Sequence, residues 1–195
     1  MSQRIETDVL VVGSGAAGMV TALRARERGL RTLLLESTDR LGGNSAISGG
    51  GVWVPNNHVL KREGQTDSYE EGQSYLDACV GDVGAASSPE RRHAYLTEGP
   101  AMVRWLEDLG LPWVYARGYA DYYPERQGGK VMGRCIEAKK YNIKRLGRWA
   151  DKLRFTLRTM PIYTYEFKDL MLSMRTWKGF WTAARIVGLQ ATLPR

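Results

Sequence analysis

The chain begins with an apolar run that leads directly into closely spaced glycines. Residues 7–12 are mostly aliphatic, and Gly13, Gly15 and Gly18 follow them, then a helical stretch, a second apolar run and Glu36. A short apolar run of this kind predicts a parallel strand that is buried on both faces. The order of strand, glycine turn, helix, strand and acidic residue predicts a βαβ unit that binds a dinucleotide.

The glycines of this turn have separate expected roles. Gly13 permits the tight turn, Gly15 lets the backbone approach a pyrophosphate, and Gly18 lets the following helix pack closely on the strand. The helix is expected from about Ala16 to Gly29, and its N-terminal amides can hold a diphosphate. We therefore predict cofactor contacts from the whole turn: Gly13, Ser14, Gly15, Ala16, Ala17 and Gly18.

An acidic residue ends the second predicted strand. Glu36 follows residues 32–35 and lies 18 positions after Gly18. A carboxylate there can accept both ribose hydroxyls of an adenosine and would repel a 2′-phosphate. We include Glu36 and its neighbour Ser37 among the predicted cofactor contacts. The alternative is a solvated residue at a strand end, which the complete strand–turn–helix–strand context disfavours.

A second glycine-rich loop follows, which nicotinamide-binding folds do not need. Its backbone amides and small polar side chains suit the pyrophosphate and ribityl chain of FAD. The run 48–51 would let the backbone approach a flat ring, although a mobile linker has a similar composition. FAD is therefore the predicted cofactor, with further contacts from Gly42, Gly43, Asn44, Ser45, Ser48, Gly49 and Gly50.

Length and composition limit what else the chain can contain. Its 195 residues allow one core with a small appendage, and a hydrophobic share of 43% is ordinary for a globular protein. The two cysteines and two histidines lack the spacing of a metal site or a disulfide framework, so no metal is predicted. The first strand follows the N-terminus closely, without a leader, and we expect a cytoplasmic location.

The motif of the second loop identifies a family resemblance. The segment 39–57, DRLGGNSAISGGGVWVPNN, resembles the FAD-binding domain of 3-ketosteroid dehydrogenases, which belong to the fumarate reductase and succinate dehydrogenase flavoprotein group. The resemblance covers about residues 7–150. It implies an α/β fold, a Rossmann-like FAD-binding domain with additional helices, from which the substrate-covering domain is missing. We accordingly predict an FAD-binding domain at 1–150 and a separate segment at 151–195.

Tyrosines gather in a short segment of this region. Tyr115, Tyr119, Tyr122 and Tyr123 lie within residues 115–125. The resemblance implies that Tyr122 is catalytic: it assists a second tyrosine in removing a proton beside a ketone, while the flavin N5 accepts a hydride from the adjacent carbon. A phenol, with a pKa near 10, needs such a neighbour to act as a base at neutral pH. The alternative is amphipathic packing of the tyrosines under a loop.

The stretches around the tyrosines predict helices, a short strand and a surface residue. Apolar spacing predicts helices at 67–79 and 88–109, and the second begins with Ser88 as its cap. Residues 113–115 predict a short strand. Arg134 follows the tyrosine segment in a Gly-Arg pair, and we interpret it as a surface arginine. The expected core residues of the second helix are Tyr95, Leu96, Met102, Val103, Leu106 and Leu109.

The end of the chain is strongly basic. Residues 139–195 contain 13 basic and 3 acidic side chains, whereas 1–138 contain 15 and 18. Aromatic and basic residues alternate at helical spacing in 163–190, which is typical of a helix at the lipid headgroup boundary and is too charged for a membrane span. Peripheral contact at the inner face of the membrane and ordinary packing against another part of the protein both stay open. No nucleic-acid partner is expected, because no recognised module accompanies the charge.

The predicted function is therefore that of an FAD-dependent oxidoreductase. By resemblance it dehydrogenates a ketosteroid, its small-molecule substrate, and the chain is an incomplete part of the enzyme that is inactive alone. Two alternatives stay open: a fumarate-reductase-like flavoprotein that acts on a small unsaturated acid, and a non-catalytic FAD-binding or membrane-associating module. No oligomeric state is predicted.

Overall fold

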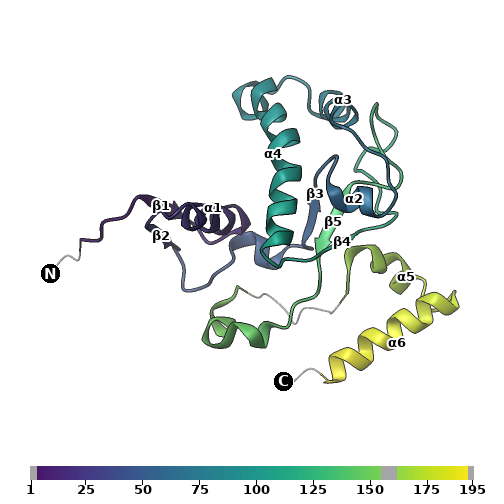
Figure 1. The fold of residues 1–195 in the computed structure, drawn as a ribbon. Helices are drawn as coiled ribbons and strands as arrows, with labels where there is room; N and C mark the ends of the chain where they lie inside the picture. Colours follow the sequence, from purple (N-terminus) through teal and green to yellow (C-terminus); the bar gives the residue numbers. More distant parts are fainter. Residues whose placement is uncertain (1–3, 155–161, 193–195) are drawn as a thin grey trace. The chain divides into compact units, whose positions relative to one another are not determined.

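A computed structural model describes residues 4–154 and 162–192 (Figure 1). Contacts between residues divide them into two compact units. The first unit contains the described residues up to Ser48 and those from Tyr141 to 154, and the second contains Gly49 to Lys140 and 162–192. This division of contacts differs from the predicted domain boundary at residue 150, which stays a prediction.

The first unit contains the βαβ arrangement. Strand β1 (Val9–Val12) leads through the glycine turn into helix α1 (Ala16–Glu27), and strand β2 (Thr32–Leu35) follows. The two strands are parallel, with Val9 opposite Thr32 and Val12 opposite Leu35. Gly29, just after the helix, has a φ of +77°, which suits glycine at the end of a helix.

The prediction that the first strand is buried on both faces is wrong for this structure. Val11 is 6% exposed and lies on the face that α1 covers, whereas Leu10 and Val12 are 54% and 78% exposed. Within the described residues the sheet contains the strand pair β1–β2. The face with Leu10 and Val12 therefore remains apolar and open.

A distant segment holds the second glycine loop within the same unit. The short helix η1 (Gly43–Ile47) follows the loop, and the irregular helix η3 (Ile143–Lys152) lies near its start. The Leu41 N–H donates to the Lys152 carbonyl at 2.7 Å, and the Arg154 N–H donates to the Leu41 carbonyl at 2.8 Å. The Arg40 guanidinium also donates to the Asp151 carbonyl. More than 100 residues of sequence separate these partners.

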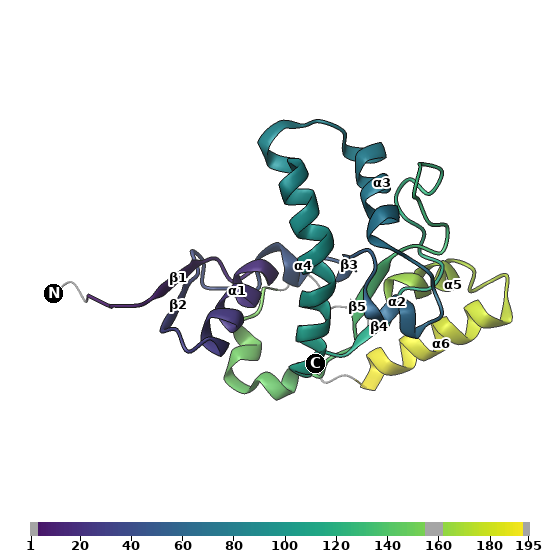
Figure 2. The same cartoon turned by 45° about the horizontal axis from the view of Figure 1, so that its top comes forward.

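The second unit is built on a small antiparallel sheet in the order β3-β5-β4. Its strands are β3 (Gly51–Trp53), β4 (Trp113–Tyr115) and β5 (Cys135–Ala138). Its helices before β4 are α2 (His58–Arg62), α3 (Tyr69–Val80), η2 (Gly84–Ser87) and α4 (Pro89–Asp108). Figures 1 and 2 show that α3 lies beside the N-terminal half of the long helix α4.

The predicted helices and the predicted short strand are confirmed in this unit. The Ser88 side chain caps α4 by accepting the Arg91 N–H at 3.4 Å. Of the expected core residues of α4, Leu96, Val103 and Leu106 are buried. Tyr95 and Leu109 are 41% and 53% exposed, so their prediction as core is wrong. The Tyr95 hydroxyl reaches the Trp53 carbonyl, and Leu109 lies just past the last helical residue.

The C-terminal part contains η4 (Thr164–Glu166), α5 (Phe167–Met171) and α6 (Trp177–Thr192). The Thr164 N–H donates to both carboxylate oxygens of Glu137 in β5, at 3.1 and 3.0 Å, and α5 packs against α6. Across the described ranges, no helix has both the length and the apolarity that a membrane crossing requires.

Candidate functional site

Ser14 joins the two glycine loops to Glu36. Its side chain is buried, and its Oγ donates to Glu36 Oε2 at 2.6 Å while its N–H donates to the same oxygen at 3.0 Å. The Oγ also accepts the Gly42 N–H at 2.8 Å. One small hydroxyl therefore connects the first turn, the acid at the end of β2 and the second loop.

The two loops approach each other backbone to backbone. A Cβ atom on Gly43 would lie 3.3 Å from the Gly15 Cα, and Ser45 Oγ accepts the Ala16 N–H at 3.1 Å. A Cβ on Gly18 would lie only 2.0 Å from the Gly13 carbonyl oxygen, so close packing of α1 on β1 requires glycine there. The predicted residues of both loops thus form one structure, which we call the cofactor cradle: residues 13–18, Glu36, Ser37 and residues 42–45.

Hydrogen bonds keep the Glu36 carboxyl ionised. The Ser14 hydroxyl, then the N–H groups of Ser14 and Thr38, lower its pKa from 4.5 to about 2. Oε2 is occupied by Ser14, whereas Oε1 is contacted by the exposed hydroxyls of Ser37 and Thr38 at 3.2 and 3.3 Å. Those two long contacts can exchange for ribose hydroxyls without disturbing Ser14. An anionic acceptor beside two loops that lack Cβ atoms fits an ADP-containing cofactor.

Some predicted contact residues lie at the margins of the cradle. Ala17 and Asn44 are exposed at the loop pair, and Ser48 Oγ donates to the Ser45 carbonyl at 2.9 Å. Gly49 and Gly50 belong to the second unit, where the Gly49 carbonyl accepts from Thr164 Oγ1 at 3.3 Å. The structure therefore gathers the predicted residues up to Ser48, and the role of Gly49 and Gly50 stays a prediction.

In the second unit, the tyrosine segment borders an apolar cavity of about 340 Å³. Tyr122 is 87% exposed, and its ring meets that of Tyr123 edge-on at 5.2 Å between centroids. Tyr115 lies apart, buried in β4 with its hydroxyl on the Met132 carbonyl. Among the described residues, those that line the cavity have no charged side chain: Trp53, Tyr75, Leu76, Cys79, Val80, Tyr119, Ala120, Tyr122, Tyr123 and Cys135. We call this space the tyrosine cavity.

A family model described as an FAD binding domain matches residues 8–188. The chain belongs to this family. Membership confirms the predicted α/β FAD-binding fold and indicates FAD as the cofactor. The match extends past residue 150, where the resemblance in the sequence motifs ends, and it includes most of the basic C-terminal segment.

Curated relatives confirm the resemblance to ketosteroid dehydrogenases. The chain is 50% identical over 143 residues to the 3-oxosteroid 1-dehydrogenase of Mycobacterium tuberculosis, covering 73% of this chain and 25% of the relative. It is 36% identical over 164 residues to the 4-oxocyclohexanecarboxylate 2-dehydrogenase of Sinomonas cyclohexanicum, covering 83% of this chain and 28% of the relative. The chain thus spans about a quarter of the length of these relatives.

A solved structure extends the likeness to the fold. The crystal structure of 3-ketosteroid delta1-dehydrogenase from Sterolibacterium denitrificans, in complex with 1,4-androstadiene-3,17-dione, matches with a TM-score of 0.82 and 32% identity. The match covers 93% of this chain and 32% of that one. The likeness therefore includes both units of this member of the FAD-binding family.

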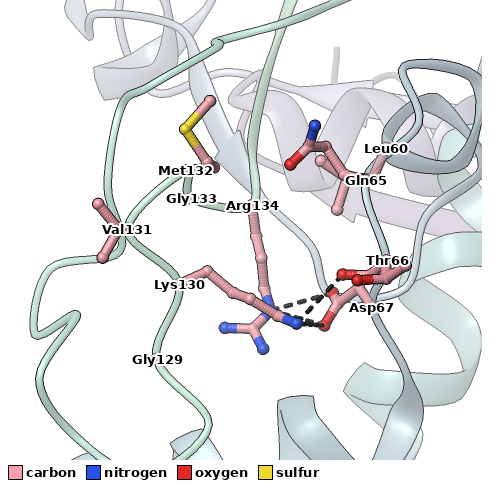
Figure 3. Close-up of a pocket in the computed structure, with 10 residues that line it drawn as sticks. All are labelled: Leu60, Gln65, Thr66, Asp67, Gly129, Lys130, Val131, Met132, Gly133 and Arg134. Carbon is pink, nitrogen blue, oxygen red and sulfur yellow. Dashed lines mark hydrogen bonds and ion pairs between the residues drawn. The ribbon is translucent and has the colours of Figure 1, made fainter.

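Arg134 is not the surface residue that its type predicts. Its side chain is fully buried, and Nε donates to both carboxylate oxygens of Asp67, at 3.1 and 3.0 Å (Figure 3). A second buried carboxylate, that of Asp121, pairs with Nη1, and the Gly128 carbonyl accepts from Nη2 at 2.7 Å. Burial is possible because these acceptors satisfy the guanidinium from several sides.

Sequence reasoning did not single out Asp67 or Asp121. Their side chains contact Arg134 across 67 and 13 residues of sequence, so no local spacing announces the cluster. The one available signal was the position of Asp121 directly before Tyr122. Throughout the described part of the chain, no group of three or more His, Cys, Asp or Glu side chains is arranged to hold a metal ion.

Proposed function

We propose that this chain forms part of an FAD-dependent dehydrogenase that introduces a carbon–carbon double bond beside the ketone of a ketosteroid. The tyrosine cavity is the observation that supports this most directly, because it offers an aromatic surface without charge to a fused-ring substrate. The names of the similar curated proteins support the same reaction. FAD, when bound, supplies the acceptor for the hydride.

Tyr122 is proposed to act on the proton. Its phenol is exposed beside Tyr119 and Tyr123, so it can meet a substrate that enters over the cavity. We infer that Tyr122 hydrogen-bonds to a second tyrosine and thereby helps it take the proton from the carbon next to the ketone. The hydride leaves from the adjacent carbon, and the two electrons of the broken C–H bond leave with it.

The cofactor cradle is proposed to hold the ADP part of FAD. Glu36 Oε1 would accept from the ribose, and the start of α1 together with the second glycine loop would hold the pyrophosphate. The proposed contacts from 48–50 lie toward the flavin. Glycine at positions 15 and 43 leaves room where the two backbones meet.

The proposed role of Tyr122 predicts a large loss of turnover in a Tyr122→Phe variant of the complete enzyme. We expect a reduction on the order of 100-fold in ketosteroid oxidation, the scale of general-base contributions. Anaerobic bleaching of the flavin absorbance by a ketosteroid measures the step directly. FAD affinity should be unchanged.

Tyr141→Phe is a suitable matched control. Tyr141 is 53% exposed and belongs to the other unit, so removal of its hydroxyl should leave turnover as it was. A Tyr122→Phe enzyme with near wild-type bleaching would exclude Tyr122 from the reaction.

A second candidate substrate is a cyclic keto acid, favoured by similarity to the 4-oxocyclohexanecarboxylate dehydrogenase. Its carboxylate would need a cation, and the lining of the tyrosine cavity contains none among the described residues. We therefore expect kcat/KM to be higher for a ketosteroid than for 4-oxocyclohexanecarboxylate. Reoxidation of reduced flavin by a small unsaturated acid would instead favour a fumarate-reductase-like activity, and a bound flavin that no substrate bleaches would indicate a non-catalytic module.

We also propose peripheral contact between α6 and a lipid surface. Trp177 and Trp181 are 80% and 66% exposed, and Phe180 lies between them at 50%. Two of the nearby cations are already paired, Lys178 with Asp169 at 2.9 Å and Arg185 with Glu166 at 2.6 Å. The aromatic side chains would therefore contribute more than the charge to binding at the headgroup boundary.

A further inference from the structure

Three buried charged side chains lie behind the tyrosine segment. Those of Arg134 and Asp121 are 0% exposed and that of Asp67 is 2% exposed. Arg134 is the cation between the two carboxylates, and the Lys130 ammonium contacts Glu71 at 2.6 Å on the outer side (Figure 3). We call Asp67, Asp121 and Arg134 the buried triad.

Asp121 fastens the tyrosine segment to the strand that contains Arg134. Its Oδ1 accepts the Trp53 indole N–H at 2.8 Å and the Arg134 N–H at 3.1 Å, and its Oδ2 accepts the Lys130 N–H at 3.1 Å. The Asp121 N–H donates in turn to the Lys130 carbonyl at 3.0 Å. Because Asp121 directly precedes Tyr122, these bonds fix the backbone from which the Tyr122 side chain projects.

The same triad supports the floor of the tyrosine cavity. The Arg134 guanidinium lies over the rings of Trp53 and Tyr75, 5.7 and 5.5 Å from their centroids. The Tyr75 hydroxyl accepts the Tyr123 N–H at 2.9 Å. The cluster therefore contacts the segment above the cavity and two aromatic side chains that line it.

Stability is a poor explanation for such a cluster. Burying a guanidinium and two carboxylates costs desolvation energy, and apolar replacements of similar volume are often neutral or stabilising. What an ionic cluster adds is direction, because each carboxylate oxygen accepts its donors from fixed sides. A function in geometry accounts for the triad better than a function in stability.

We propose that Asp67, Asp121 and Arg134 are positioning residues that set the orientation of Tyr122 over the tyrosine cavity. The inference rests on the proposed function of Tyr122. The triad does not touch the substrate. It acts by holding the backbone of Tyr122 and the aromatic floor in one fixed arrangement.

A double-mutant cycle in the complete enzyme tests this. Asp121→Asn retains the size of the side chain and removes its charge, and Tyr122→Phe removes the phenol. We expect Asp121→Asn to lower kcat by about 10- to 100-fold, the scale of a misplaced reacting group, with a smaller change in KM for a ketosteroid. In the Tyr122→Phe background the same substitution should change kcat by no more than about twofold, because its effect passes through the phenol.

The possible results separate the inference from the proposed function. If Tyr122→Phe slows turnover and Asp121→Asn slows it equally with and without the phenol, the positioning role is overturned while the function of Tyr122 stands. If Tyr122→Phe leaves turnover unchanged, both are overturned. As a control for lost stability, Leu106→Ala removes a buried side chain of α4, and its effect on kcat should be the same in both backgrounds.

A spectroscopic measurement on the 195-residue chain keeps the inference testable if Asp121→Asn folds poorly in the enzyme. The chain is labelled with 3-fluorotyrosine, and the ¹⁹F signal of Tyr122 is assigned with Tyr122→Phe. Arg134→Lys should shift or split that signal and leave the Tyr141 signal unchanged. An unaltered Tyr122 signal in a folded Arg134→Lys chain would overturn the proposal.

Discussion

At the scale of single residues, the Ser14 hydroxyl is the contact on which the cofactor cradle depends. It donates to Glu36 and accepts from Gly42, and it is buried, so no water can replace it without rearrangement. Ser14→Ala would leave both partners without their bond. We expect a loss of about 1–3 kcal/mol in the free energy of unfolding of this unit, together with weaker FAD binding.

Urea denaturation and FAD titration measure these two effects. Ser37→Ala is the control, since Ser37 is exposed and its one contact to Glu36 is long, at 3.2 Å. The control should change stability by less than about 0.5 kcal/mol. Equal effects from the two variants would contradict the special role of Ser14.

The depressed pKa of Glu36 predicts a pH dependence of stability. Because folding lowers this pKa from 4.5 to about 2, the folded state favours the ionised carboxylate. Its stabilisation is complete above the unfolded pKa and is lost as the pH falls from about 4.5 toward 2. Thermal unfolding between pH 6 and 2.5, followed by near-ultraviolet circular dichroism, should show a shallower decline for Glu36→Gln.

The pH prediction also has an internal comparison. Asp8, whose bonds to Arg31 lower its pKa to about 2, should contribute to the same decline, so the Glu36→Gln chain retains part of it. Asp39→Asn removes an exposed carboxylate and should leave the profile unchanged. A Glu36→Gln profile identical to that of the wild type would contradict the prediction.

At the scale of elements, the sequence predicted what local signals specify. The glycine spacing placed the turn between β1 and α1, and Ser88 with Pro89 placed the start of α4. Strand β5 was not predicted, because it exists through pairing with β3 and β4, which lie more than 70 and 15 residues earlier. Arg134 was mispredicted for the same reason, since its burial depends on carboxylates that only the tertiary fold brings near.

Helix α6 provides the prediction that belongs to this scale. Its exposed indoles should insert at the boundary of a bilayer, so the complete protein should co-sediment with vesicles that contain anionic lipid. Replacing Trp177 and Trp181 by serine should abolish most of that binding. Because Lys178 and Arg185 are paired within the protein, added salt should weaken binding less than the two substitutions do.

The control for the lipid experiment is Trp149→Ser. Trp149 is 52% exposed but lies in η3, outside α5 and α6. Its loss should leave co-sedimentation unchanged. Binding that survives the double substitution in α6 would favour the other interpretation, in which this helix packs against another part of the protein.

At the scale of the whole molecule, the two units differ in how completely they bury their apolar residues. The second unit encloses Leu60, Val103 and Ile136 almost fully. In the first, β1 and β2 form a two-stranded sheet within the described residues, with α1 over one face. The relatives are about four times as long as this chain, so further chain is available in them to cover such a face.

The open face of β1 predicts that the 195-residue chain associates with itself. Leu10 and Val12 point to the same side of the strand, and Val12 is paired with Leu35, which is 47% exposed. An uncovered apolar strand pair favours edge-to-edge association. Replacing Leu10 and Val12 by threonine, which retains β propensity, should lower the sedimentation-average mass at high concentration and leave the far-ultraviolet circular dichroism unchanged. Leu109→Thr alters an exposed apolar residue at the end of α4 in the second unit and should have little effect. If the double substitution left the mass unchanged, association would have to come from another surface, of which the exposed indoles of α6 are the next to test.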